Sequence, residues 1–398
     1  MISKVWFLPF LLGVDCYTIT QEILLQKTLL NGYNRRIRPG NDRSKPVNVV
    51  ASFNLVTLKE FSETDGKIAV VGAFRLRWKD ERLAWDPASY GYDLYSTKVF
   101  FEDIWVPKFV NLNPYDQLKR VGLDEMDCVL QDNGMVDFRP PDLYESTCDA
   151  DVTYYPFDKQ NCSLLYYIPG YSTTDIKILA ESSTFNMELY KENGLWKVIE
   201  TSFTIETIYK NVEVITLTIF MTRRTTYYIA GLLLPIVLMN FIQLFVFLLP
   251  VESGERLGFS ITVLLAVAVF LTIIQDKLPE ASEPNISLLT YKLFVDMIIG
   301  CGMILAVVIG MRFYHRSDDI QVPWILRGLT RCYLCCTPKQ SIRPDEVVQI
   351  ESENLDMGSD KMSITWIDVG KAFDIVCLSL FFLSLVLNNI VYFITIFV

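Results

Sequence analysis

Hydrophobic positions follow an alternating pattern through the first half of the chain. Between residues 17 and 224 no apolar run is long enough to cross a membrane, and short segments such as VNVVASFNLVTL and KIAVVGAFRLRW alternate in character. They are rich in β-branched and aromatic residues, and turn-forming sequences such as ETDG and QDNG separate them. Many short strands at this spacing predict an all-β sandwich over residues 17–224.

Long apolar segments replace this alternation after Arg224. Four of them reach the roughly 20 residues that a membrane helix needs. They cover residues 227–249, 256–274, 288–313 and 373–398. We therefore expect three membrane helices within residues 225–313, a short cytoplasmic region at 314–372 and a last membrane helix at 373–398. Arg312 and Arg316 follow the third segment, and the positive-inside tendency then places the sandwich and the C-terminus outside.

Composition narrows the class of function. The net charge of −10 argues against a nucleic-acid partner, which would require a basic surface. The single histidine leaves little scope for acid–base or zinc chemistry, and no nucleophile–base pair or phosphate-binding loop is present, so we expect neither an enzyme nor a cofactor. Residues 1–16 combine one lysine with a short apolar run, which is typical of a signal peptide and of a chain whose following residues are extracellular.

Cys148 and Cys162 enclose thirteen residues, DADVTYYPFDKQN. In an oxidising compartment such a pair is typical of a disulfide that closes a short loop. From the spacing alone, an ordinary structural disulfide is as good an interpretation as a functional one. Asn161 begins the sequence Asn-Cys-Ser, which is an N-glycosylation site.

The loop between these cysteines contains Tyr155, Pro156, Phe157 and Asp158 in succession, and it resembles the signature of the Cys-loop receptors, which are pentameric ligand-gated ion channels. The segment WVP at residues 105–107 resembles the WxP strand of that family. MTRRTTYYIAGLLLP and FLLPVESGERLGFSITVLLAVAVFLTIIQ resemble the first membrane helix and the pore helix of the nicotinic acetylcholine receptor branch. The resemblance implies an extracellular β-sandwich followed by a four-helix transmembrane bundle in the plasma membrane, including postsynaptic membranes. It also implies assembly with four further subunits, identical or homologous.

The predicted pore helix carries one stripe of residues at helical spacing. Residues three or four positions apart share a helix face. The stripe consists of Glu255, Gly258, Thr262, Leu265, Val269, Thr272, Ile273 and Asp276. It has carboxylates at both ends, small or hydroxylated residues near the first end and apolar residues above them. A packing helix whose terminal charges face water is the alternative interpretation.

In a pentamer each position of this stripe becomes a ring of five side chains. Rings of Glu255 and Asp276 would concentrate monovalent cations, and apolar rings of Leu265 and Val269 would gate the pore by dewetting. Anion-selective relatives carry an inserted Pro-Ala before this helix, which the segment SGE lacks. The resemblance points Arg256 away from the pore axis, so we predict cation selectivity.

The resemblance also assigns residues that couple ligand binding to the pore. It places Glu63 in a turn after the first long strand and Arg223 just before the first membrane helix, and we expect these two to form a partly buried ion pair. The tip of the cysteine loop and the loop containing Pro284 would complete this set.

The aromatic cage that holds acetylcholine in nicotinic relatives is missing from the expected positions. Those positions are Leu112, Pro169 and Ala73, and the expected pair of adjacent cysteines is absent from the last hairpin. A small-molecule ligand other than caged acetylcholine is then expected, with weak candidate contacts at Tyr167, Tyr171 and Tyr209. The alternatives are that these tyrosines belong to the sandwich surface or core, and that the chain is a structural or accessory subunit that binds no agonist.

Overall fold

The computed structural model describes most of the chain. The described residues are 18–90, 93–123, 125–208, 211–279, 286–316, 321–324, 326–328, 330–331 and 364–397. The chain divides into two compact units, and each is described by itself. The β-sandwich unit comprises Met1–Asp151 and Lys159–Arg224, and the helical unit comprises Val152–Asp158 and Thr225–Val398.

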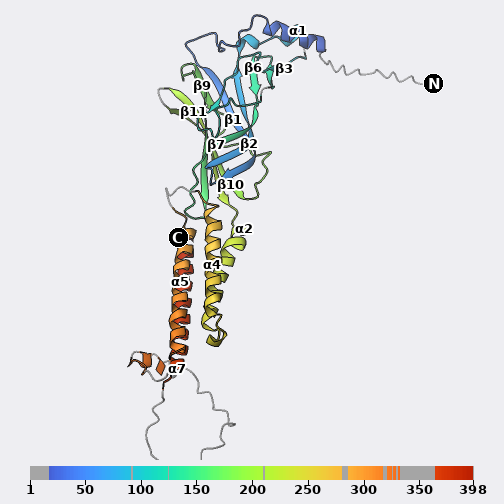
Figure 1. Cartoon of the computed structure of the whole chain (residues 1–398). Coiled ribbons are helices and arrows are strands. Elements are labelled where there is room, and N and C mark those ends of the chain that lie inside the picture. Colours follow the sequence, from blue (N-terminus) through green and yellow to red (C-terminus); the bar gives the residue numbers. More distant parts are fainter. Residues whose placement is uncertain are drawn as a thin grey trace, which may run out of the picture. The chain divides into compact units, whose positions relative to one another are not determined.

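The β-sandwich unit contains the predicted two sheets (Figure 1), preceded by helix α1 (Ile19–Leu30), which Thr18 and Gln21 cap reciprocally. One sheet has the strand order β3-β5-β6-β2-β1-β9, with β7 also paired to β2, and the other has the order β10-β11-β8-β4. The strands of the first sheet are β1 (Val47–Ser62), β2 (Lys67–Lys79), β3 (Ser96–Phe100), β5 (Asp127–Gln131), β6 (Met135–Phe138), β7 (Pro141–Thr147) and β9 (Ile176–Ala180). Those of the second sheet are β4 (Val110–Asn111), β8 (Lys159–Tyr167), β10 (Trp196–Ile208) and β11 (Val212–Arg223).

The alternation read from the sequence places every second side chain of β1 in the core. Val49 and Phe53 are completely buried, and they pair in antiparallel register with Trp78 and Phe74 of β2. The ring of Phe53 also makes an edge contact with Tyr144, at a centroid distance of 5.2 Å. Period-two burial of aromatic and branched residues fixes the register, because a slip of one residue would turn this whole set to the solvent.

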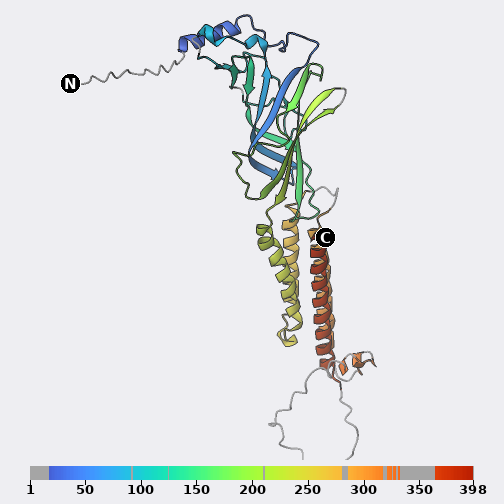
Figure 2. The ribbon, with the colours of Figure 1, turned by 180° about the vertical axis from the view of Figure 1, so that it is seen from behind.

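Within its described residues, the helical unit contains four helical segments that are long and apolar enough to cross a membrane. The first joins α2 (Thr226–Tyr228), a π-helical turn (Ile229–Leu233), α3 (Leu234–Gln243) and a 3-10 turn (Leu244–Phe247); the others are α4 (Arg256–Gln275), α5 (Leu288–Tyr314) and α7 (Trp366–Phe397). Figures 1 and 2 show α5 and α7 running side by side. A β-carbon at Gly300 of α5 would lie 2.8 Å from Leu264 Cδ1 of α4, so this glycine allows the two helices to approach closely.

The last helix begins seven residues before the predicted residue 373. Thr365 and Asp368 exchange hydrogen bonds in the manner of a capping box, with Asp368 N donating to Thr365 Oγ1 and Thr365 N to Asp368 Oδ2. This cap starts the helix at Trp366, ahead of the continuous apolar run on which the prediction rested.

Candidate functional site

One face of α4 is exposed along its whole length. All eight residues of the predicted stripe, from Glu255 to Asp276, are exposed in the single chain, and Leu265 is 64% exposed. The opposite face is buried against the rest of the helical unit, at Ser260, Val263 and Val267 among others. The helix is apolar on both faces, so the two differ in burial more than in polarity. The stripe therefore lies on the solvent-exposed face of the helix within the single chain.

The basic residue at the start of α4 lies on the buried side. The guanidinium of Arg256 is 2.9 Å from Asp374 Oδ2 of α7, and its Nε donates to the carbonyl oxygen of Leu249 at 2.7 Å. Tyr314 of α5 donates a second hydrogen bond to the same carboxylate oxygen. Arg256 is only 4% exposed. Its charge is therefore compensated inside the helical unit and does not reach the exposed stripe.

A second ion pair is buried in the middle of the helical unit. Lys292 and Asp296, one turn apart on α5, are 2.5 Å apart and almost completely buried. Asp296 also accepts hydrogen bonds of 2.7 Å from Asn240 of α3 and Asn388 of α7. One carboxylate thus joins three of the four membrane-type helices. Sequence analysis missed this network, although two opposite charges inside an apolar segment of α5 were a signal for it.

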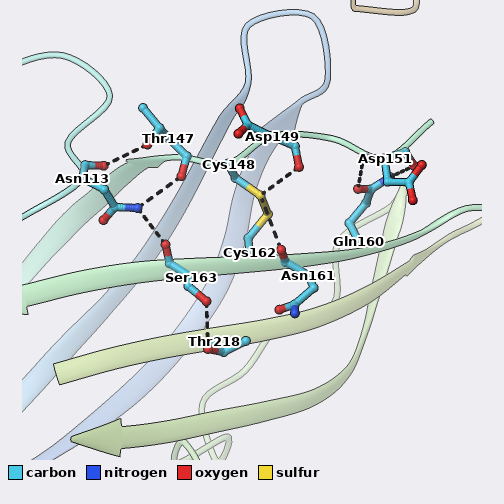
Figure 3. The surroundings of a disulfide bond; sticks show 10 residues. All are labelled: Asn113, Thr147, Cys148, Asp149, Asp151, Gln160, Asn161, Cys162, Ser163 and Thr218. Carbon is cyan, nitrogen blue, oxygen red and sulfur yellow. Dashed lines mark hydrogen bonds between the residues drawn. A yellow bond between two sulfur atoms is a disulfide. The ribbon is translucent and has the colours of Figure 1, made fainter. Parts of the chain in front are cut away.

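The predicted disulfide between Cys148 and Cys162 is confirmed, with a Cα–Cα distance of 5.4 Å (Figure 3). It joins the chain just after β7 to the middle of β8. Close to it, Asp151 and Gln160 form reciprocal hydrogen bonds of 3.0 and 2.9 Å between backbone and side chain. Asn113 donates to the carbonyl oxygen of Ser163 at 2.9 Å, so the base of the loop is held by polar contacts as well as by the disulfide.

The tip of the cysteine loop belongs to the helical unit. The chain leaves the β-sandwich unit after Asp151 and returns to it at Lys159. Within the helical unit, Leu288 N at the start of α5 donates to the carbonyl oxygen of Thr153 at 2.9 Å. The rings of Tyr155 and Phe157 pack on Tyr228 of α2 and on Phe397 at the end of α7, at centroid distances of 5.6 and 5.4 Å respectively. The peptide bond between Tyr155 and Pro156 is cis.

Glu63 and Arg223 form the ion pair that was predicted for them. The Arg223 guanidinium is 2.6 Å from Glu63 Oε1, and the arginine side chain is only 2% exposed. The guanidinium also lies 4.3 Å from the ring centre of Trp196, which is a cation–π contact. The strand ends of β10 and β11 hold this arrangement, because Trp196 and Arg223 are paired residues of the two strands.

The predicted ligand contacts fall in different places. Tyr171 is half-buried and accepts a 3.4 Å hydrogen bond from the Trp105 indole, whereas Tyr167 lies at the end of β8 and pairs with Val110 and Val214. The exposed Asn161 side chain stands on β8 beside the disulfide, where glycosylation remains a prediction. Tyr209, Pro284 and the predicted signal peptide lie outside the described residues.

Sequence profiles of one family match both units. The profile of the neurotransmitter-gated ion-channel ligand-binding domain matches residues 22–225, and that of the neurotransmitter-gated ion-channel transmembrane region matches residues 232–329.

The chain is also similar to curated subunits of acetylcholine receptors. The acetylcholine receptor beta subunit of Xenopus laevis is 29% identical over 323 residues, which cover 78% of this chain and 65% of the relative. The neuronal acetylcholine receptor subunit alpha-6 of Homo sapiens is 30% identical over 333 residues, which cover 80% of this chain and 65% of the relative. The chain thus spans just under two thirds of the length of these proteins. Because the profile of the ligand-binding domain matches half of this chain, the chain belongs to the neurotransmitter-gated ion-channel family.

Proposed function

We propose that this chain is a subunit of a pentameric, cation-selective, ligand-gated channel in the plasma membrane, with α4 lining the pore. The observation that supports the proposal is that acidic and basic side chains lie on different faces of α4. The carboxylates of the stripe are on the exposed face, and the one basic residue of the helix, Arg256, is buried against Asp374. Five copies of such a face around an axis would make rings that attract cations.

The two ends of the stripe differ in net charge. At the first end Glu252 and Glu255 are both exposed, and the guanidinium of Arg256 is turned inward. At the other end Asp276 is followed by Lys277, which is also exposed, so charges of both signs are present. We therefore assign most of the selectivity to Glu255. From Glu255 to Asp276 the helix rises about 32 Å, close to the thickness of the hydrocarbon core.

The effect of ligand binding outside the membrane would be transmitted to this pore by the cysteine loop and the Glu63–Arg223 pair. The cysteine loop is fixed at its base in the β-sandwich unit by the disulfide, and its tip packs on three helices of the helical unit. We propose that this loop, with the Glu63–Arg223 pair, transmits the binding event. The ligand would be a small molecule other than acetylcholine in the usual cage, although the relatives are named acetylcholine receptor subunits.

A second candidate function follows from the missing cage. Leu112, Ala73 and Pro169 occupy the expected aromatic positions, so the chain could serve in a heteromer as an accessory subunit that supplies pore and interfaces but binds no agonist. Voltage-clamp recording from cells that express only this chain with Leu265→Ser separates the two functions. Wetting the proposed apolar gate is expected to give a standing current in a homopentamer.

The reversal potential of that current tests selectivity. It should follow the external sodium concentration and not the chloride concentration, and adding Glu255→Lys should reverse that dependence. Leu264→Ser, the same change on the side of α4 that packs on α5, is the matched control and should give no standing current. A chloride-dependent reversal potential would contradict the proposed selectivity, and surface protein without current would favour the accessory role.

A further inference from the structure

A cavity of about 510 Å³ lies inside the β-sandwich unit and is separate from the ion pathway proposed above. Four connections meet there: the one from α1 to β1, the one from β3 to β4, the one from β4 to β5, and the chain that follows β8. A volume of this size is within the range of sites that enclose small organic ligands.

The floor of the cavity is apolar and largely aromatic. Trp105, Phe101 and Phe138 line it and are each at most 5% exposed, and the last two rings are stacked at a centroid distance of 5.9 Å. Tyr171 lines the side, and its hydroxyl accepts the hydrogen bond from the Trp105 indole. Such a floor offers a large contact area to a flat or bulky apolar group.

The position of the Trp105 backbone is fixed by a buried polar cluster. Its N–H donates to the hydroxyl oxygen of Tyr33 at 3.0 Å, and this hydroxyl donates to Asp80 Oδ2 at 2.7 Å. Arg82 donates to both the tyrosine oxygen and the aspartate. Burial raises the pKa of Tyr33, so the hydroxyl keeps its proton and its bond to Asp80. The floor is therefore preorganised.

The rim of the cavity is basic. Among the described lining residues, four side chains carry positive charge, Arg35, Arg36, Lys108 and Arg120, and one, Glu102, carries negative charge. This collection of cations stands on a chain whose net charge is −10, so it is not a consequence of overall composition.

Glu102 is the carboxylate among the described lining residues, and its contacts with the rim cations are long. Glu102 is 3.9 Å from Arg35 and 4.0 Å from Arg120, with about half of its side chain exposed, and ion pairs of this kind contribute little. Among the described residues, Arg36 and Lys108 have no ion-pair partner. Arg120 also lies 4.7 Å from the ring centre of Phe101, a cation–π contact that places its guanidinium beside the floor.

We propose that this cavity binds a small organic anion, a carboxylate carried on an aromatic or other apolar body. The body would cover the aromatic floor, and the carboxylate would accept hydrogen bonds from the Arg36 guanidinium and the Lys108 ammonium. An organic cation would also find aromatic faces, but four like charges on the rim would repel it. The inference concerns binding alone and holds whether or not the chain conducts ions.

The test is isothermal titration calorimetry on the full chain, purified in lipid nanodiscs, with 4-phenylbutyrate as the probe. The comparison compound is 4-phenylbutylamine, which has the same apolar body and the opposite charge. We expect the carboxylate to bind at least ten times more tightly than the amine, and its affinity to fall when the salt concentration rises.

Variants locate the binding site. Arg36→Gln combined with Lys108→Gln should weaken carboxylate binding at least tenfold and leave the thermal unfolding of the chain nearly unchanged, because both side chains are exposed. Lys119→Gln removes a cation next to Arg120 that does not line the cavity, and it should bind like the parent. Equal or tighter binding of the amine, unchanged binding by the double variant, or no binding of either probe at millimolar concentration would each overturn the proposal.

Discussion

The two units place their ion pairs in opposite surroundings. In the β-sandwich unit many pairs have at least one exposed partner, as in Arg139–Asp137, where the arginine side chain is 60% exposed. In the helical unit, Lys292 and Asp296 are at most 2% exposed. Water screens the first kind of pair and makes each partner dispensable, whereas a buried charge depends on its partner.

This difference separates two uses of charge in the helical unit. Buried charges such as Asp296 are saturated by hydrogen bonds from several helices, so they hold the helices together. Charges on the exposed face of α4, such as Glu255, are open to solvent in the single chain, and we propose that they act on ions. Burial therefore distinguishes structural charges from candidate functional charges in a part of the chain where both are rare.

The largest effect is expected at the buried pair of α5. Asp296→Leu would leave the Lys292 ammonium without its carboxylate in an apolar interior, which costs about 3–5 kcal/mol in comparable buried pairs. We expect a large loss of the folded chain, measured as surface expression and as the unfolding temperature in detergent.

A double variant sharpens that result. Lys292→Met together with Asp296→Leu removes both charges and should recover most of the lost stability, because a well-packed apolar pair often replaces a buried ion pair at little cost. If the double variant were as unstable as the single one, the Asn240 and Asn388 contacts would be the important ones and not the charge pair.

A smaller effect is expected at the Glu63–Arg223 pair of the β-sandwich unit, whose glutamate side chain is 17% exposed. Glu63→Gln would remove the negative charge facing the buried Arg223, with an expected loss of about 2 kcal/mol, typical of a hydrogen bond to a charged group. The unfolding temperature of the full chain measures it. Asp65→Asn, at an exposed position in the same turn, is the control. An equal loss of stability in this variant would contradict a stabilising contribution of the Glu63–Arg223 pair.

The smallest effect is expected at a surface pair and depends on pH. Burial alone would raise the pKa of Asp137, but hydrogen bonds from Arg139 and Arg75 outweigh it and lower the pKa. The pair therefore stabilises the fold above the unfolded pKa, near 3.8, and this contribution is lost as pH falls through the lower folded value. Asp137→Asn should cost below about 1 kcal/mol at pH 7. Unfolding curves at pH 7 and pH 2 should show the stability difference from the parent narrowing at the lower pH, and a constant difference would contradict this account.

The periodicity of the sequence predicted most of the fold and the exposed stripe of α4. Alternation predicted the strands, apolar length predicted the membrane-type helices, and helical spacing selected six residues of α4 and its two cap residues, all of which are exposed. Each of these signals is local, since side chains two, three or four positions apart are related by the geometry of one element. The resemblance to a family added the Glu63–Arg223 pair and the inward direction of Arg256, which local patterns do not contain.

Contacts between distant segments could not be read in the same way. Asp296 meets Asn240 and Asn388, which lie 56 and 92 positions away, so only the Lys292–Asp296 part of the network had a signal in the sequence. The basic cavity draws its lining from separate connections of the sandwich. Of the tyrosines chosen as ligand candidates, Tyr171 lines that cavity and Tyr167 does not.

Reaction of single cysteines on α4 with charged thiol reagents tests the central claim most directly. Thr262→Cys and Val263→Cys are placed on the Leu265→Ser background, because Thr262 is exposed on the stripe and its neighbour Val263 is buried. The account predicts that a positively charged methanethiosulfonate blocks current through Thr262→Cys, at least ten times faster than a negatively charged one, and leaves Val263→Cys and the parent unaffected. Equal block at both positions, or faster block by the negative reagent, would contradict a cation pathway along this face of α4.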